Sequence, residues 1–198
     1  MENNKLMDSL HSKEKLEVIN QIKEIYNFIR IKKFCRLIPE VRTNIAGALN
    51  DAKIKGDVAG IDGRITIVNG IPKAAGEIKF GAAEHTARLI LTAKKFDKSI
   101  NFVINLKYSS ELIKNIKNKT DLQLEEILRE TEPLEIKSKE FSTMQWLIKE
   151  SIDKSRKIPD IIWDKGSIGK EPMLRLFAKT STDMIKKLKI IIDISQQL

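Results

Sequence analysis

The sequence predicts a mixed α/β fold in which at least part of the sheet is antiparallel. Segments with helical spacing of apolar residues alternate along the whole chain with short apolar or alternating segments that are typical of strands. Two tight turn sequences, Asp62-Gly63 and Asn69-Gly70, connect neighbouring strand candidates directly, as in antiparallel hairpins. With 198 residues, 41% of them hydrophobic, the chain is long enough for one domain with a substantial core.

The helices are predicted from apolar residues that recur on one helical face. They lie at residues 14–34, 84–96, 109–119, 142–155 and 181–195. The first is amphipathic, and Pro39 is expected to close it. Ser142 or Thr143 is expected to cap the fourth helix, and Ser181 the fifth.

The strands are predicted from apolar or alternating runs bounded by turn residues. They lie at residues 44–49, 57–61, 64–68, 100–108, 122–128, 161–163 and 173–178. The segment 122–128 is placed among them because its apolar residues at first alternate with polar ones.

Composition narrows the class of protein. The chain has no apolar run of about 18 residues and no signal peptide at its start, so we expect a cytoplasmic protein with no membrane partner. A single cysteine, Cys35, fits a reducing compartment and allows no internal disulfide. Only two histidines accompany it, which argues against a zinc site built on His and Cys.

The net charge of +9 favours anionic partners such as phosphorylated metabolites. Aromatic residues make up only 6% of the chain, so a nucleic-acid surface with stacking platforms is not expected. Lysine outnumbers arginine 28 to 8, and only arginine offers a rigid fork for phosphate or carboxylate. This contrast directs attention to Arg64, Arg88, Arg129 and Arg175.

The segment FGAAEHTARLIL, residues 80–91, leads from a glycine into a helix. Exposed N–H groups at a helix start bind anions, so Gly81 and this first turn form a candidate phosphate site. His85 lies in that turn, where the helix dipole favours a neutral imidazole, and Arg88 follows three residues later on the same face. The alternative is a first-turn histidine that merely hydrogen-bonds a neighbour.

Two turns carry further candidates. Arg64 follows the Asp62-Gly63 turn at a strand start, where an ordinary exposed arginine is the alternative. The loop GSIGKE joins two strands; Gly166, Gly169 and Lys170 suit a phosphate, although an ordinary turn is an equally good interpretation. The carboxylates Asp62, Asp164 and Glu171 also lie near turns, and they either hold Mg²⁺ through water or are plain turn residues.

Six blocks in order resemble the archaeal-type thiamine-phosphate synthase domain, the ThiN family. They read LIPEVRTNIAGALNDA, DVAGIDGRI, FGAAEHTARLILTAKKFD, INLKYSSE, STMQW and PDIIWDKGSIGKEPMLRLFAK. The resemblance runs from about Leu37 to Lys189. It implies a transferase that joins hydroxymethylpyrimidine pyrophosphate to hydroxyethylthiazole phosphate, giving thiamine phosphate and pyrophosphate.

The resemblance also assigns site residues. The essential arginine and histidine of the family fall on Arg64 and His85, and Asn44 in the first block joins the substrate-binding residues. Mg²⁺ would arrive bound to the pyrophosphate, with no metal-binding residues assigned on the chain. The implied fold is a three-layer α/β/α arrangement with a mixed, largely antiparallel sheet, similar to class II aldolases.

Family members are often the C-terminal half of a fusion with phosphomethylpyrimidine kinase, so an upstream kinase domain is an expected partner. Residues 1–36 are then interpreted as an arm or linker with one amphipathic helix, and residues 37–198 as the synthase-like domain. The rival hypothesis from another class is a regulatory module that binds thiamine phosphate without catalysis. A third, a basic nucleic-acid binder, predicts affinity that falls steeply with salt.

Overall fold

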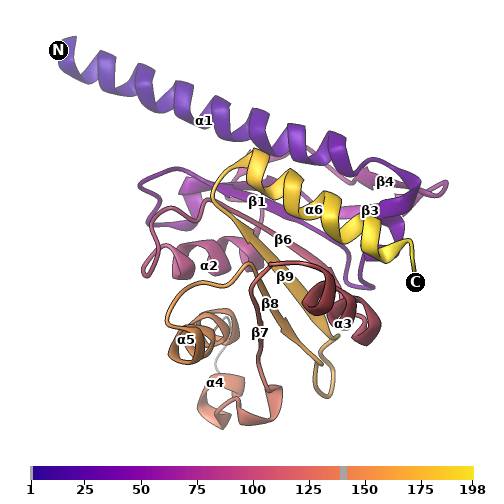
Figure 1. Cartoon of the computed structure of the whole chain (residues 1–198). Coiled ribbons are helices and arrows are strands. Elements are labelled where there is room, and N and C mark those ends of the chain that lie inside the picture. The colour runs from indigo at the N-terminus through magenta and orange to yellow at the C-terminus, as the bar shows by residue number, and fades with distance from the viewer. Residues whose placement is uncertain (1, 139–141) are drawn as a thin grey trace.

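A seven-stranded sheet forms the centre of the molecule (Figure 1). The computed structural model describes residues 2–138 and 142–198, with side chains described from residue 10 onward. Across the sheet the strands are β5 (Ile78–Phe80), β2 (Val58–Ile61), β1 (Ile45–Ala48), β6 (Phe102–Lys107), β9 (Met173–Ala178), β8 (Ile161–Asp164) and β7 (Leu124–Glu126). All neighbours pair antiparallel except β7 and β8, which are parallel.

A separate hairpin carries the residues after the Asp62-Gly63 turn. It consists of β3 (Ile65–Val68) and β4 (Ile71–Ala74). A single bridge between Thr43 and Ile65 ties it to the chain just before β1. The residues that precede β1 and those that precede β3 therefore lie next to each other.

Helices cover both faces of the sheet, which makes three layers. On one face lie α1 (Glu2–Ile29), α6 (Ser181–Ser195) and α3 (Ser110–Lys119); on the other lie α2 (Glu84–Ala93), α5 (Thr143–Ser155) and the short α4 (Leu134–Ser138). Short 3-10 turns complete the described elements: η1 (Lys32–Leu37), η2 (Lys55–Asp57) and η3 (Arg129–Thr131). The expected mixed, largely antiparallel α/β fold is thus confirmed.

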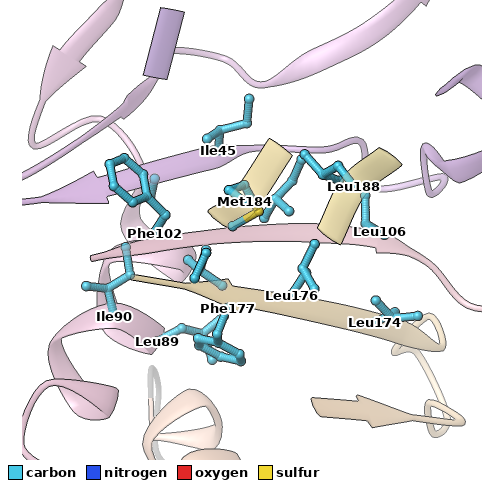
Figure 2. Packing of buried hydrophobic residues seen from close by; sticks show 14 of the residues in the cluster. Ile45, Leu89, Ile90, Phe102, Leu106, Leu174, Leu176, Phe177, Met184 and Leu188 are labelled. Atoms are coloured by element: carbon cyan, nitrogen blue, oxygen red, sulfur yellow. The ribbon is translucent and has the colours of Figure 1, made fainter. Parts of the chain in front are cut away.

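The central strands are buried on both faces, which explains their continuous apolar runs. Every residue of β1, β2, β8 and β9 is buried. Figure 2 shows Met184 and Leu188 of α6 on one side of β6 and β9, and Leu89 of α2 on the other side. Each layer of helices therefore covers one face of the sheet, and the buried side chains of both faces belong to one hydrophobic cluster.

The first helix differs from its predicted bounds. It spans Glu2–Ile29 rather than residues 14–34, and η1 follows it before Pro39 is reached. The helix ends early because the chain turns after Ile29, so that Phe34 and Leu37 become buried. The boundary between an arm, 1–36, and a domain, 37–198, stays a prediction, but buried side chains of α1 belong to the same hydrophobic cluster as the sheet.

One predicted cap holds in position only, and another was wrong. Ser142, one of the two predicted alternatives, occupies the N-cap position of α5, but its backbone is already helical, its side chain makes no capping hydrogen bond and its hydroxyl donates to the Ile136 carbonyl at 2.7 Å. At α6 the cap is Thr180, whose side chain accepts from the Asp183 N–H, and Ser181 is the first helical residue. None of the helices in the described ranges has the length and apolar character needed to cross a bilayer.

Candidate active site

A cavity of about 580 Å³ opens on the side of the sheet that carries α2 and α5. Its wall is formed by the chain before β1, the turn before β3, the first turns of α2 and α5, and the ends of β6, β8 and β9. The volume is within the range of roughly 300–1,000 Å³ that small-molecule sites occupy. The residues that line the cavity run from Val41 to Arg175 in the sequence, so segments more than 100 positions apart meet here.

Arg64 and His85 both line this cavity. Arg64 has a left-handed backbone, with φ of 71°, directly after Gly63 with φ of 72°. A non-glycine residue in that region is uncommon and is often found where function requires a fixed side chain. The Arg64 guanidinium donates from Nη1 to the Val41 carbonyl at 2.5 Å, which holds it against the segment before β1.

His85 lies in the first turn of α2, and no side chain caps this helix start. The ring keeps an exposed face, yet burial by the cavity wall lowers the pKa of His85 below 6.5, and the positive charge of Arg64 lowers it further. Glu84 opposes this shift. The predicted neutral imidazole is therefore supported, with burial and Arg64 as physical causes in addition to the expected helix dipole.

A buried ion pair forms part of the cavity wall. Arg175 of β9 donates from Nη1 to Asp164 Oδ2 of β8 at 2.7 Å, and both side chains are almost fully buried. Burial lowers the pKa of Arg175, while Asp164 raises it by its charge and hydrogen bond. Because a guanidinium does not deprotonate near neutral pH, this pair holds a fixed positive group beside the cavity.

Asn44 also lines the cavity, but its amide is engaged by the neighbouring strand. Its Nδ2 donates to the Ile61 carbonyl at 2.8 Å, and its Oδ1 accepts from the Ile61 N–H at 3.0 Å. Ile61 immediately precedes the turn that carries Arg64. These bonds fix that turn, and substrate contact by Asn44 stays a prediction.

The GSIGKE loop reaches the same cavity as Arg64 and His85, as expected. Ser167 and Lys170 close a tight turn through two backbone hydrogen bonds, and Gly169 occupies its left-handed position with φ of 73°. Gly169 and Lys170 line the cavity. The Lys170 ammonium lies 3.5 Å from Glu132 Oε2 and 3.4 Å from Thr143 Oγ1.

Gly166 has a different place from the one predicted. It is not part of the described cavity wall, and its N–H donates to Asp164 Oδ1 at 2.8 Å. A Cβ at this position would collide with the Lys170 carbonyl. Gly166 is therefore required for the close packing of the loop, and its role in substrate binding stays a prediction without a cavity contact.

Two further predicted residues lie outside the described cavity wall. Arg88 pairs through Nη2 with Glu84 Oε1 at 2.8 Å, one helical turn away. Gly81 has φ of 80° and donates its N–H to the Val58 carbonyl, so it shapes the entry into α2. Neither has a cavity contact in the described structure, and their roles in substrate binding stay predictions.

The structure adds cavity residues that were not expected as ligand contacts: Arg42, Asn105, Arg129, Thr143 and Met144. Arg42 has a left-handed backbone like Arg64, with φ of 70°. In the sequence, only the scarcity of arginine draws attention to Arg129 and Arg175. In total five basic and three acidic side chains line the cavity, so its wall carries a net charge of +2 with His85 neutral.

The acidic side chains of the wall are already engaged. Glu171 accepts from the backbone N–H groups of Glu40 and Val41 at 2.8 and 3.0 Å, Asp164 pairs with Arg175, and Glu84 with Arg88. Within the described residues, no three His, Cys, Asp or Glu side chains form a group that fits a metal ion.

Comparison with known protein families shows to which family the chain belongs. The model of the family described as thiamine-phosphate synthase ThiN matches residues 21–190. The chain belongs to the ThiN family. The resemblance inferred from the six sequence blocks is thus confirmed over most of the chain.

Two similar proteins from archaea carry names of the same family. The bifunctional thiamine biosynthesis protein ThiDN of Methanocaldococcus jannaschii is 41% identical over 157 residues, which are 78% of this chain and 36% of that protein. The chain thus spans about a third of that relative. The thiamine-phosphate synthase ThiN of Methanothermobacter thermautotrophicus is 29% identical over 85% of this chain and 88% of its own length.

Among solved structures, the C-terminal domain of a phosphomethylpyrimidine kinase superposes with a TM-score of 0.79 at 34% identity. The match covers 90% of this chain and 98% of that domain. The ThiN fold described above is therefore also the fold of a domain that occurs behind a kinase.

Proposed function

We propose that this ThiN chain is a thiamine-phosphate synthase that joins hydroxymethylpyrimidine pyrophosphate and hydroxyethylthiazole phosphate, releasing pyrophosphate. The observation that carries the proposal is the meeting of Arg64, His85 and Lys170 in one cavity of suitable volume. Family membership over residues 21–190 gives independent support. Both substrates are anions, which fits the net positive wall.

The reaction breaks the bond between the pyrimidine methylene carbon and the pyrophosphate oxygen, and the electron pair leaves with the pyrophosphate. The thiazole nitrogen forms the new carbon–nitrogen bond and becomes positively charged. Groups aimed at the charge that develops in this step contribute most to the rate. Arg64, fixed by its left-handed backbone and its bond to Val41, suits the leaving group.

His85 is expected to act as a neutral imidazole. The lowered pKa means that its ring is uncharged near pH 7. A neutral ring donates one hydrogen bond, either to the leaving pyrophosphate or to the pyrimidine. Mg²⁺, bound to the pyrophosphate, would neutralise charge on the leaving group.

The experiment mixes both substrates with the protein and Mg²⁺ and measures thiamine phosphate by chromatography. Arg64→Ala and His85→Ala should each lower turnover by about 100-fold or more, the usual loss for a partner of transition-state charge. Arg30→Ala is the matched control, because Arg30 is exposed directly after α1 and lies outside the described cavity wall. Binding of thiamine phosphate without any turnover by the unaltered protein would instead support a regulatory module.

The proposal has two wider parts, an upstream partner and a location. An upstream kinase domain is a proposed partner, because the relative ThiDN is bifunctional and the superposed domain comes from a phosphomethylpyrimidine kinase. A cytoplasmic location is also proposed, supported by the free thiol of Cys35, which fits a reducing compartment.

A further inference from the structure

Arg129, in the 3-10 turn after β7, is a buried arginine with unused hydrogen-bond donors. It is 3% exposed and lines the cavity. Its Nη2 lies 3.3 Å from Glu132 Oε2, but Nε and Nη1 have no hydrogen-bond partner. The nearest carboxylate oxygen recorded for Nε is Asp164 Oδ1 at 4.0 Å, which is too far for a hydrogen bond.

Buried guanidinium N–H groups without acceptors are unfavourable, so native proteins rarely leave them unpaired. Arg129 is the one arginine of the cavity wall for which the described structure records buried atoms of this kind. A ligand oxygen in the cavity would satisfy them. Arg129 therefore points to an anion that is bound when the protein functions.

The start of α5 lies in the same part of the cavity. Thr143 and Met144, its first two residues, line the wall, and the side chain of Ser142 at the N-cap position makes no capping hydrogen bond. The Gln145 N–H of this turn bonds to the Ser142 carbonyl at 3.1 Å, whereas the first N–H groups of a helix, here those of Thr143 and Met144, have no partner within it, and the helix dipole places positive charge there. This 13-residue helix adds backbone donors to those of Arg129.

Two buried carboxylates hold the cations of this region in place. Glu132 contacts Arg129, Lys170 and the Thr143 hydroxyl, which donates to it at 2.6 Å. Asp164 holds Arg175. With Arg129, Lys170 and Arg175 against Glu132 and Asp164, three positive charges face two negative ones, and the cluster has a net charge of +1.

We propose that Arg129, Lys170 and the first turn of α5 form a second anion subsite, which binds a phosphate monoester. The proposal rests on the proposed function and names the thiazole phosphate as its ligand. Sheet order supports the division: Arg64 and His85 adjoin the half with β2 and β1, whereas Arg129 and Lys170 adjoin the half with β7, β8 and β9. The pyrophosphate then lies with Arg64 and His85, where charge develops, and the unreactive phosphate lies with Arg129.

The test measures binding of hydroxyethylthiazole phosphate by calorimetry with no pyrimidine present, so that no turnover occurs. Arg129→Gln should weaken binding about 10- to 100-fold, the range expected for hydrogen bonds to a charged group. Pyrophosphate binding should change less than about threefold, which is within the range of near-neutral effects. Arg64→Met should show the reverse preference.

Two controls keep the result interpretable. Arg129→Lys retains the positive charge but loses the forked guanidinium, so its affinity for the thiazole phosphate should fall between those of the unaltered protein and Arg129→Gln. It also keeps a positive partner for Glu132, which matters if the neutral variant fails to fold. The unphosphorylated thiazole alcohol should bind all folded variants equally. Equal binding of thiazole phosphate by Arg129→Lys and the unaltered protein, or parallel losses for pyrophosphate, would overturn the proposal.

Inorganic phosphate separates this proposal from the proposed function. If the chain is no synthase, no thiamine phosphate forms, but phosphate should still bind the unaltered protein more tightly than Arg129→Lys. If it is a synthase without this subsite, thiamine phosphate forms and the Arg129 variants bind phosphate as the unaltered protein does.

Discussion

Gly60 of β2 packs closely against Ala83 at the start of α2, the helix that carries His85. Gly60→Ala should therefore lower turnover by displacing His85, although Gly60 itself does not line the cavity. Gly60 lies in β2, and a Cβ built there would collide with the Cβ of Ala83 and lie 3.1 Å from the Ile45 carbonyl oxygen. Ala83 is the N-cap of α2, two residues before His85. The added methyl group must therefore displace either β2 or the start of α2.

The size of the effect can be worked out from this contact. Overpacking of a well-filled interior costs about 1–3 kcal/mol. In a chain of this size that lowers the Tm by roughly 2–12 °C, since 1 kcal/mol corresponds to about 2–4 °C. A shift of about 1 Å at a catalytic group costs about 100-fold in rate, so turnover should fall far more than the folded fraction.

Thermal unfolding and the thiamine-phosphate assay, run on the same preparations, measure both effects. Gly56→Ala is the matched control, because a Cβ there meets nothing closer than the Ile54 side chain at 3.7 Å. Ala83→Gly removes the colliding methyl group and should restore part of the activity in the double variant, since glycine is an acceptable N-cap. Unchanged turnover and Tm in Gly60→Ala would refute the reasoning.

Two further predictions concern the charges of the cavity. The pKa of His85 lies below 6.5, so its contribution to stability is complete above pH 6.5 and is lost as the pH falls through the lowered value. An NMR titration can follow this group, because His11 is the only other histidine of the sequence. Arg64→Met should raise the pKa of His85, and Arg88→Met should raise it less. An unshifted pKa in Arg64→Met would contradict the assigned cause. Lys170→Ala should raise the KM for one phosphorylated substrate and leave kcat and the other KM nearly unchanged. The reason is that the variant loses a contact that is made equally in the ground state and in the transition state. Steady-state kinetics with each substrate varied in turn would contradict this if both KM values rose together.

Local patterns were sufficient for most of the fold and for part of the site. The turn before Arg64, the start of α2 and the hairpin around Lys170 all follow from sequence signals within a few residues. The pairing of Arg88 with Glu84 was also readable, because residues at i and i+4 on a helix are neighbours. The i+3 spacing of Arg88 and His85 predicts that Arg88 binds substrate phosphate, and this role stays a prediction.

The remaining parts of the site depend on contacts between distant segments. The sequence suggests Gly166 as a phosphate contact, but it does not show that the Gly166 N–H bonds to Asp164 or that the missing Cβ makes room for the Lys170 carbonyl. Arg129 begins the three-residue 3-10 turn η3, which is too short for a periodic apolar pattern, and only the scarcity of arginine singles it out in the sequence. Its burial and its unpaired donors come from the way η3 packs beside β8 and β9, which no local pattern reveals.

The helix α1 offers a test of where the folded unit begins. Four of its side chains are 0–5% exposed within the core that includes the sheet: Val18, Ile22, Ile25 and Ile29. Full burial of such a side chain contributes about 1.5–3 kcal/mol, so the four together contribute about 6–12 kcal/mol. That is comparable with the whole stability of a typical domain, about 5–15 kcal/mol.

A chain limited to residues 37–198 should therefore lack a cooperative unfolding transition, whereas a chain that begins at Lys13 keeps all four side chains and should unfold cooperatively. Circular dichroism during heating measures both. Ile22→Ala in the full chain should lower stability by about 2–5 kcal/mol, as for other fully buried isoleucines. A cooperative transition of 37–198 at the temperature of the full chain would mean that residues 1–36 are an arm. Loss of the transition in 37–198 alone would mean that a folded ThiN unit in this protein has to include the segment from α1 to η1, because α1 packs on β1, β2 and β5, whereas α6 on the same face packs on β6 and β9, and Phe34 of η1 is fully buried.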